Sequence, residues 1–138
     1  QKVDKDLSVA GQLQPGELAA LREAGFRSII CNRPDGEAPD QPSFGAIEEQ
    51  ARKLRMQARY LPVVPGAIGD EHGVAFGALL AELPKPILSY CRTGRRSATL
   101  WALSESGRQP VADILAAAKG AGFDLGELAA RIAGDVAP

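Results

Sequence analysis

A seven-residue segment joins a nucleophile to groups that bind anions. It consists of Cys91, Arg92, Thr93, Gly94, Arg95, Arg96 and Ser97. An apolar run typical of a buried strand comes before it, and a helical pattern comes after it. A short loop between strand and helix turns backbone N–H groups inward, and the helix N-terminus adds positive potential there. The segment therefore predicts a thiolate at Cys91 that attacks a bound anion and keeps part of it covalently.

Two further positions of this loop have a physical reason for their residue type. Arg96 is the expected anion clamp, because a guanidinium binds an oxyanion through two parallel N–H bonds. Gly94 permits a backbone turn that a Cβ atom would resist. The competing interpretation is an inert cysteine beside solvated arginines, but three charges within five residues resist burial.

The spacing between Cys91 and Arg96 separates two chemistries. Arg96 is the fifth residue after Cys91, whereas cysteine-dependent phosphatases carry this arginine at the sixth position. Those enzymes also usually have a histidine before the cysteine, where this chain has Tyr90. Rhodanese-type sulfurtransferases use the shorter loop, which this segment resembles. A smaller cradle suits a persulfide better than a phosphoryl group with its three equatorial oxygens.

Alternating strand and helix patterns must position this loop. The expected strands cover residues 7–11, 28–31, 60–64 and 87–90, and the expected helices begin near residues 15, 43, 70, 97, 111 and 125. This order predicts an α/β fold with a mainly parallel central sheet of about four or five strands, flanked by helices. Residues 108–138 are expected to form a helical tail that packs rather than takes part in chemistry.

Length and composition limit the remaining possibilities. The chain has 138 residues, which predicts a single domain over 1–138. A net charge of −1 argues against nucleic-acid binding, and no apolar run is long enough to cross a membrane. Two cysteines without ligand spacing and one histidine predict no metal and no cofactor. The first residue, Gln1, suggests a piece of a longer protein, and reduced thiol chemistry fits the cytoplasm.

Three ordered motifs resemble one bacterial family. They are Ser8–Gln12 (SVAGQ), Asn32–Glu37 (NRPDGE) and Tyr90–Ser97 (YCRTGRRS). Together they are similar to the beta-lactamase-hydrolase-like, phosphatase-like domain family, also described as sulfur transferases, over roughly residues 5–130. The resemblance implies the fold of tyrosine and dual-specificity phosphatases. It also implies a partner, because many members are fused to a metallo-hydrolase domain of the persulfide dioxygenase type.

The same resemblance assigns roles within the loop. Cys91 would be the nucleophile and persulfide carrier, and Arg96 the anion clamp. The loop amides that hold the substrate would come from Arg92, Thr93, Gly94 and Arg95. Ser97 would donate a hydrogen bond to the thiolate from the start of the helix.

Other candidate residues lie outside the loop. Arg33 and Asp35 follow the neighbouring strand, so they either line the rim of the site or hold a turn by hydrogen bonds. Asp70 is the expected general acid of a phosphatase, with a helix N-cap as its other interpretation. It stands 21 residues before Cys91, closer than is usual in phosphatases of this class. His72 is expected at the surface.

Three hypotheses follow for the function. The leading one is a sulfurtransferase that carries sulfane sulfur on Cys91, taken from thiosulfate or a small persulfide and passed to a thiol. The alternative is a cysteine-dependent phosphatase that forms a phosphocysteine at the same residue. The third is a module that binds anions without turning them over. In each case the ligand is a small anion of sulfur or phosphorus. Cys31 and Trp101 are expected in the core.

Overall fold

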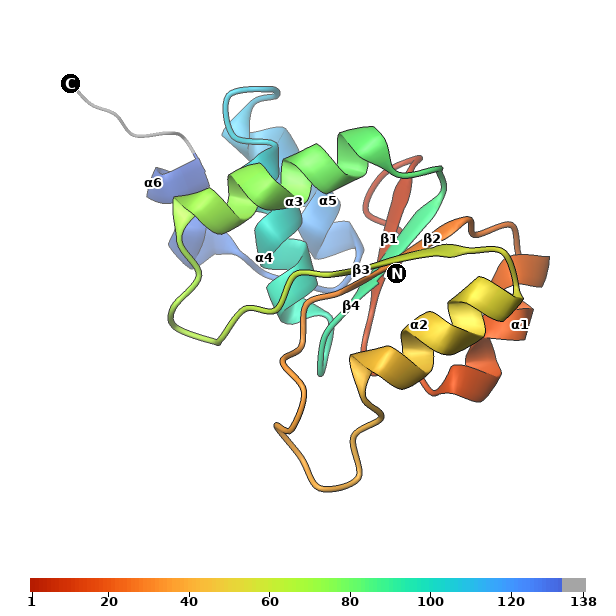
Figure 1. Ribbon diagram of the computed structural model, residues 1–138. Coiled ribbons are helices and arrows are strands. Elements are labelled where there is room, and N and C mark those ends of the chain that lie inside the picture. The colour runs from red at the N-terminus through yellow and green to blue at the C-terminus, as the bar shows by residue number, and fades with distance from the viewer. Residues whose placement is uncertain (133–138) are drawn as a thin grey trace.

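The computed structural model describes residues 1–132, with a four-stranded sheet at its centre (Figure 1). The strands are β1 (Leu7–Ala10), β2 (Ser28–Cys31), β3 (Gln57–Tyr60) and β4 (Ile87–Tyr90). They lie in the order β1-β4-β2-β3, and every neighbouring pair is parallel. The predicted α/β fold with a parallel sheet of about four or five strands is confirmed.

Helices cover both faces of this sheet. They are η1 (Pro15–Glu17), α1 (Leu18–Glu23), α2 (Phe44–Lys53), α3 (Asp70–Glu82), α4 (Arg95–Ser104), α5 (Val111–Gly120), η2 (Gly126–Leu128) and α6 (Ala129–Ile132). Helices α1 and α2 lie on one side, and α3 to α6 lie on the other (Figure 1). The tail is helical as predicted as far as Ile132, and residues 133–138 lie outside the described part. None of the helices within residues 1–132 has the length and apolar character to cross a membrane.

Side-chain alternation along the strands divides the core into two parts. Ile29 and Leu88 face α1 and α2, whereas Ile30 and Ile87 face the larger helical layer. All four are buried, because a parallel sheet covered on both faces buries consecutive residues of its strands. Trp101 on α4 is buried in the larger part, as predicted. The two helical layers therefore cover both faces of the sheet beneath the loops at its edge.

The third strand lies earlier in the chain than the predicted range 60–64. It is Gln57–Tyr60, at the edge of the sheet, where its side chains are exposed or half-buried and give no apolar run. The ladder stops before Pro62, which has no N–H to donate. The N–H groups of Leu61 and Val63 on either side still donate across to the β2 chain, at 2.9 and 3.0 Å.

The starts of two helices differ in how they are capped. Ser43 caps α2 as predicted, since its side chain accepts from the N–H of Ala46 at 3.1 Å. Asp70 is not the N-cap of α3 but its first residue, and Gly69 takes the cap position. The N–H of Gly69 donates to Nδ1 of His72 at 2.9 Å, so this histidine is half-buried and serves the helix start.

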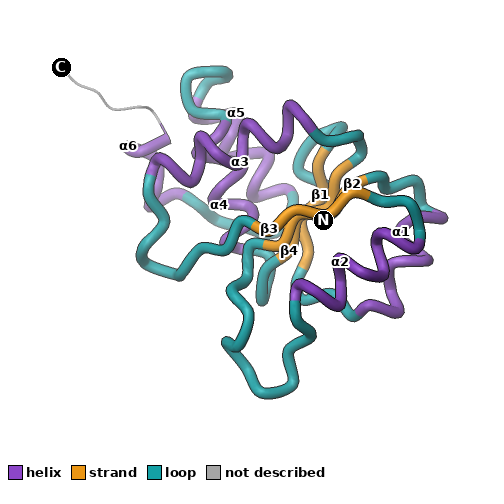
Figure 2. Tube along the Cα trace, viewed as in Figure 1, coloured by secondary structure: helices purple, strands orange, loops and turns teal. Residues whose placement is uncertain are grey.

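Three loops leave the sheet at the same edge, where the candidate site must form. Tyr90 at the end of β4 pairs with Ala10 of β1 on one side and with Cys31 of β2 on the other. The residues that follow these three strands therefore lie side by side at the carboxyl-terminal edge of the sheet. In Figure 2 the long loop between β2 and α2 extends from this edge, away from the helices that cover the sheet. Each of the three sequence motifs continues into one of these loops.

We expect Ile30→Ala to destabilise the fold by about 2–5 kcal/mol, because it leaves a cavity in a fully buried position of β2. Val74→Ala on α3 is the matched control, since Val74 is 74% exposed and its loss should cost less than about 0.5 kcal/mol. Urea unfolding of both variants measures the difference. Equal losses in the two variants would contradict the described core.

Candidate active site

Cys91 lies beneath the N-terminus of α4, at the end of the central strand β4. Its side chain is fully buried. The backbone N–H of Gly94 donates to Sγ of Cys91 at 3.1 Å. Gly94 is the N-cap of α4 with φ +96°, and a Cβ atom there would come within 2.9 Å of Phe123. The tight turn predicted at Gly94 is therefore present, and it holds the sulfur at the helix start.

Arg96 brings a guanidinium to the same place. The residue lies in the first turn of α4 and is only 8% exposed. Its Nη1 and Nη2 donate to the two carboxylate oxygens of Glu37 at 2.7 and 2.8 Å, and Nη1 also donates to the Val63 carbonyl at 3.0 Å. Hydrogen bonding to the Glu37 carboxylate raises the pKa of Arg96. The predicted clamp therefore lies in the first turn of the helix whose N-cap residue, Gly94, binds the sulfur.

Glu37 is a residue of the site that the sequence analysis did not single out. It lies in the loop between β2 and α2, and its carboxylate also accepts from Nε of Arg33 at 2.9 Å. Hydrogen bonds from Arg96 and then from Arg33 lower the pKa of Glu37 from 4.5 to about 2. The signal that could have found it was its place at the end of the Asn32–Glu37 motif. Only Arg33 and Asp35 were taken from that motif as substrate contacts.

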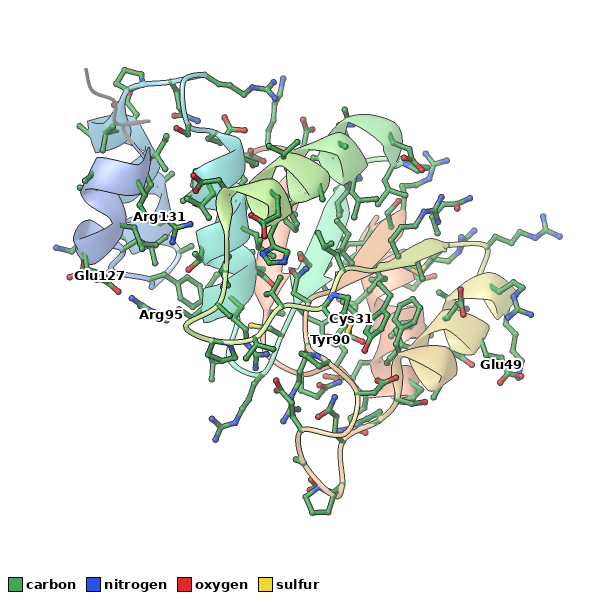
Figure 3. All side chains as sticks on the ribbon, turned by 60° about the vertical axis from the view of Figure 1, so that its left-hand side comes forward. Cys31, Glu49, Tyr90, Arg95, Glu127 and Arg131 are labelled. Carbon is green, nitrogen blue, oxygen red and sulfur yellow. The ribbon has the colours of Figure 1, made fainter. Side chains whose placement is uncertain are left out.

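A pocket of about 400 Å³ opens beside the loop that follows Cys91, although the buried Cys91 is not itself among the lining residues. Its walls include Ile68 after β3, the loop and helix residues Arg92, Thr93, Arg95 and Arg96, and the tail residues Glu127, Leu128 and Arg131. The tail, which was expected to pack rather than to take part in chemistry, thus also forms one wall of this pocket through η2 and α6. Arg95 binds the Glu127 carboxylate and, at 3.1 Å, the Asp124 carbonyl. Figure 3 shows Arg95, Glu127 and Arg131 close together at the tail.

The Ser97 hydroxyl is engaged away from the thiolate. It donates to Oδ1 of Asn32 at 2.8 Å, and Ser89 donates to the same oxygen at 2.6 Å. Asn32 in turn donates from Nδ2 to the Leu61 carbonyl at 2.9 Å, which fixes the orientation of its amide. Ser97, Ser89 and Asn32 are all fully buried. Ser97 therefore ties α4 to β2 and β4 instead of making the hydrogen bond to Cys91 that the resemblance implied.

Arg33 and Asp35 lie behind the pocket, not in its lining. Arg33 is buried, and its Nη1 donates to the Gln12 side chain at 3.0 Å. The Asp35 carboxylate accepts from the N–H of Phe44 at 2.8 Å, at the first residue of α2. Of the two interpretations given for this motif, the hydrogen-bonded turn describes these contacts. Arg33 still belongs to the site, because it also binds Glu37.

Asp70, the expected general acid, lies next to the pocket without lining it. Its side chain is 85% exposed and accepts from Arg131 Nη2 at 3.0 Å. It lines a neighbouring cavity, which shares Arg131 with the pocket beside the Cys91 loop. The structure therefore does not bring Asp70 together with Cys91.

The second cysteine, Cys31, belongs to the hydrophobic core. Cys31 at the end of β2 is buried as predicted, and desolvation raises its pKa. It packs beside Tyr90 on the α1 and α2 side of the sheet (Figure 3). Cys91 follows Tyr90 directly and turns its sulfur to the start of α4. Within the described residues, no group of three His, Cys, Asp or Glu side chains could hold a metal ion.

Comparison with known proteins shows the family to which the chain belongs. The family model described as "Beta-lactamase hydrolase-like protein, phosphatase-like domain" matches residues 1–108. The chain belongs to this family. It is 34% identical over 126 residues to the beta-lactamase hydrolase-like protein of Xylella fastidiosa (strain Temecula1), and 35% identical to that of Agrobacterium fabrum. These matches cover 90% of this chain but only 29% of the relatives' own length.

Solved structures show the same fold. A candidate phosphatase from Neisseria meningitidis is 30% identical, with a TM-score of 0.86 over 96% of this chain and 95% of that one. Tk-PTP in its active form has a TM-score of 0.75 at 16% identity, over 96% and 92% of the two chains. P. aeruginosa TpbA has 0.66 at 14% identity, over 96% and 82%. The last two show likeness of fold alone. The phosphatase-like fold predicted for this family member is confirmed.

The ion pairs of Glu37 should make the free energy of unfolding depend on pH in the acid range. Because the folded-state pKa of Glu37 is lowered, its contribution to stability is full above pH 4.5 and is lost as the pH falls toward 2. We expect the difference in free energy of unfolding between wild type and Glu37→Gln to shrink over that range. Urea unfolding at several pH values measures it, with exposed Glu49→Gln as the control. A difference that does not change with pH would contradict the lowered pKa.

Proposed function

We propose that this domain is a cysteine-dependent phosphatase that acts through a phosphocysteine on Cys91. The observation that supports it best is the hydrogen bond from the Gly94 N–H to the buried Cys91 sulfur, with Arg96 in the first turn of the same helix. This arrangement supplies a nucleophile and positive charge at one point, as transfer of a phosphoryl group requires. The Neisseria meningitidis relative, itself a candidate phosphatase, resembles almost the whole chain.

The reaction would proceed in two displacements. The Cys91 thiolate attacks phosphorus, so that an S–P bond forms while the ester P–O bond breaks and its electron pair leaves on oxygen. Water then attacks phosphorus, the S–P bond breaks, and inorganic phosphate and the thiolate are released. Arg96 and the amides at the start of α4 would stabilise the negative oxygens in both steps. The organic part of the ester would lie against Ile68 and Leu128 in the pocket wall.

An aryl phosphate is the appropriate first substrate. A phenolate leaves more readily than an alkoxide, and the fold neighbour TpbA has been observed in complex with pTyr. We expect hydrolysis of p-nitrophenyl phosphate, with Cys91→Ser lowering kcat by about 10⁴-fold or more and Arg96→Lys by about 10²–10³-fold. Cys31→Ser is the matched cysteine control and should retain activity, provided that it folds. Hydrolysis that survives in Cys91→Ser would disprove the proposal.

Sulfur transfer remains a second candidate because of one feature, the spacing of Cys91 and Arg96. The cradle is one residue shorter than in phosphatases, which suits a persulfide. In this reaction the thiolate attacks the outer sulfur of thiosulfate, a new S–S bond forms on Cys91, and sulfite leaves with the electron pair of the broken S–S bond. An acceptor thiolate then removes the outer sulfur and restores the Cys91 thiolate.

Intact mass after incubation with thiosulfate separates the two candidates. Sulfur transfer predicts a gain of one sulfur atom on the wild type and on Cys31→Ser, removed by cyanide, and no gain on Cys91→Ser. If the sulfur adduct forms and aryl phosphates are not hydrolysed, sulfur transfer replaces the phosphatase. If no adduct forms on a thiol that iodoacetamide still alkylates, sulfur transfer is excluded for this donor.

A further inference from the structure

Three of the five N–H bonds of the Arg96 guanidinium are used within the protein, and two remain for a ligand. Glu37 takes one bond from each terminal nitrogen, and the Val63 carbonyl takes the second bond of Nη1. A planar guanidinium has five N–H bonds in a fixed fork, so Nε–H and one bond of Nη2 remain. These two bonds are parallel and form the side edge of the fork. Arg96 lies in the first turn of α4, and the N-cap of this helix, Gly94, donates its N–H to Sγ of Cys91, so both groups belong to the same helix start.

Glu37 is itself held from the other side. Its Oε1 accepts from Arg33 Nε at 2.9 Å, and Arg33 Nη1 donates to the Gln12 side chain at 3.0 Å. The backbone N–H of Gln12 donates to the Arg92 carbonyl at 3.3 Å. This chain of contacts therefore ends in the loop that carries Cys91. Arg33 is 6% exposed and Arg96 is 8% exposed, so both cations are shielded from water. The low pKa of Glu37, about 2, keeps its carboxylate charged under ordinary conditions.

We propose that Glu37 is a positioning residue for Arg96, and that Arg33 and Gln12 hold Glu37 in place. Glu37 occupies the end of the guanidinium and thereby turns its side edge to the oxyanion that Cys91 attacks. The inference rests on the proposed function in so far as Arg96 binds substrate oxygens. It also connects the three sequence motifs through one role, the orientation of Arg96. The first motif contributes Gln12, the second Arg33 and Glu37, and the third Arg96 itself.

A competing arrangement would use the same contacts differently. The Glu37 carboxylate could occupy the place of the substrate anion, so that it inhibits the site instead of organising it. The two arrangements predict opposite results when the charge of Glu37 is removed. A positioning residue loses anion affinity on substitution, whereas an internal competitor gains it. Oxyanion affinity therefore distinguishes them directly, without any need for turnover.

The test uses Glu37→Gln, with Glu49→Gln as the matched control. Glu49 lies on α2 in an exposed pair with Lys53, away from the Cys91 loop (Figure 3). Tungstate is the probe, and the readout is the concentration that protects Cys91 from alkylation by iodoacetamide. We expect Glu37→Gln to need about 10–100-fold more tungstate and to lose a similar factor in kcat/KM for p-nitrophenyl phosphate, since a misplacement of about 1 Å can cost about 10²-fold. Glu49→Gln should match the wild type in both.

A double-mutant cycle shows whether Glu37 acts through Arg96. In an Arg96→Lys background, Glu37→Gln should have little further effect on tungstate protection, because lysine cannot present the forked edge. A purely structural role would lower protection by the same factor in both backgrounds. If Glu37→Gln is unfolded by circular dichroism, Gln12→Ala carries the test, with a smaller loss in the same direction expected.

The outcomes separate the inference from the proposed function. If the wild type hydrolyses no ester while tungstate still protects Cys91, the phosphatase proposal fails and the Glu37 inference is decided by the protection data. Equal protection in Glu37→Gln and Glu49→Gln overturns the inference, and so does tighter tungstate binding by Glu37→Gln. Absence of protection in the wild type overturns it as well, because Arg96 would then not bind an oxyanion.

Discussion

A cation held away from water at the start of the helix that binds the Cys91 sulfur is the constraint on which the site depends. The Arg96 side chain is almost buried, and an unpaired guanidinium in such a place would be strongly destabilising. Glu37 supplies the opposite charge from a loop that belongs to another strand. That loop must therefore return to the start of α4, and Arg33 in turn needs Gln12 as a further partner. The need to pair the charge of Arg96 thus connects the loops that follow β1, β2 and β4.

The order of the strands makes this arrangement possible. Strand β4 lies between β1 and β2, so the loop that carries Cys91 has the loops after both neighbours beside it. Ligand sites of open α/β sheets form at the carboxyl ends of the strands for this reason. The buried hydrogen bonds from Ser89 and Ser97 to Asn32 connect β4, α4 and the end of β2 at the same edge of the sheet. Position in the sheet, more than any local preference, brings the motifs together.

The fold by itself does not choose the reaction. Phosphatase relatives share the architecture of the sheet, but a fold can host several chemistries, and the choice lies in the site. Here the short loop between Cys91 and Arg96 and the wall formed by the tail set the size of the pocket. The ion pairs that attach the tail, such as Arg131 with Asp70, are largely exposed and add little stability.

Local patterns in the sequence were sufficient to place most of the elements. Three of the four strands, the start of α2 at Ser43 and the turn at Gly94 follow from apolar runs, a capping side chain and a glycine. The exception is β3, because an edge strand with exposed polar residues has no apolar signal, and the ladder there ends before Pro62. The start of α3 was misplaced by one residue, since Asp and Gly are both acceptable at a cap.

The sequence alone also determined which residues could carry the chemistry, because a cysteine followed by a glycine and arginines between strand and helix needs no distant partner to be noticed. Only the tertiary structure decided what these residues face. It paired Arg96 with Glu37, 59 residues away, gave the Ser97 hydroxyl to Asn32, and placed Glu127 and Arg131 in the pocket instead of Asp70. Such partners depend on how strands are ordered and how loops fold back. Both are set by burial and charge pairing across the whole chain, which no local pattern records.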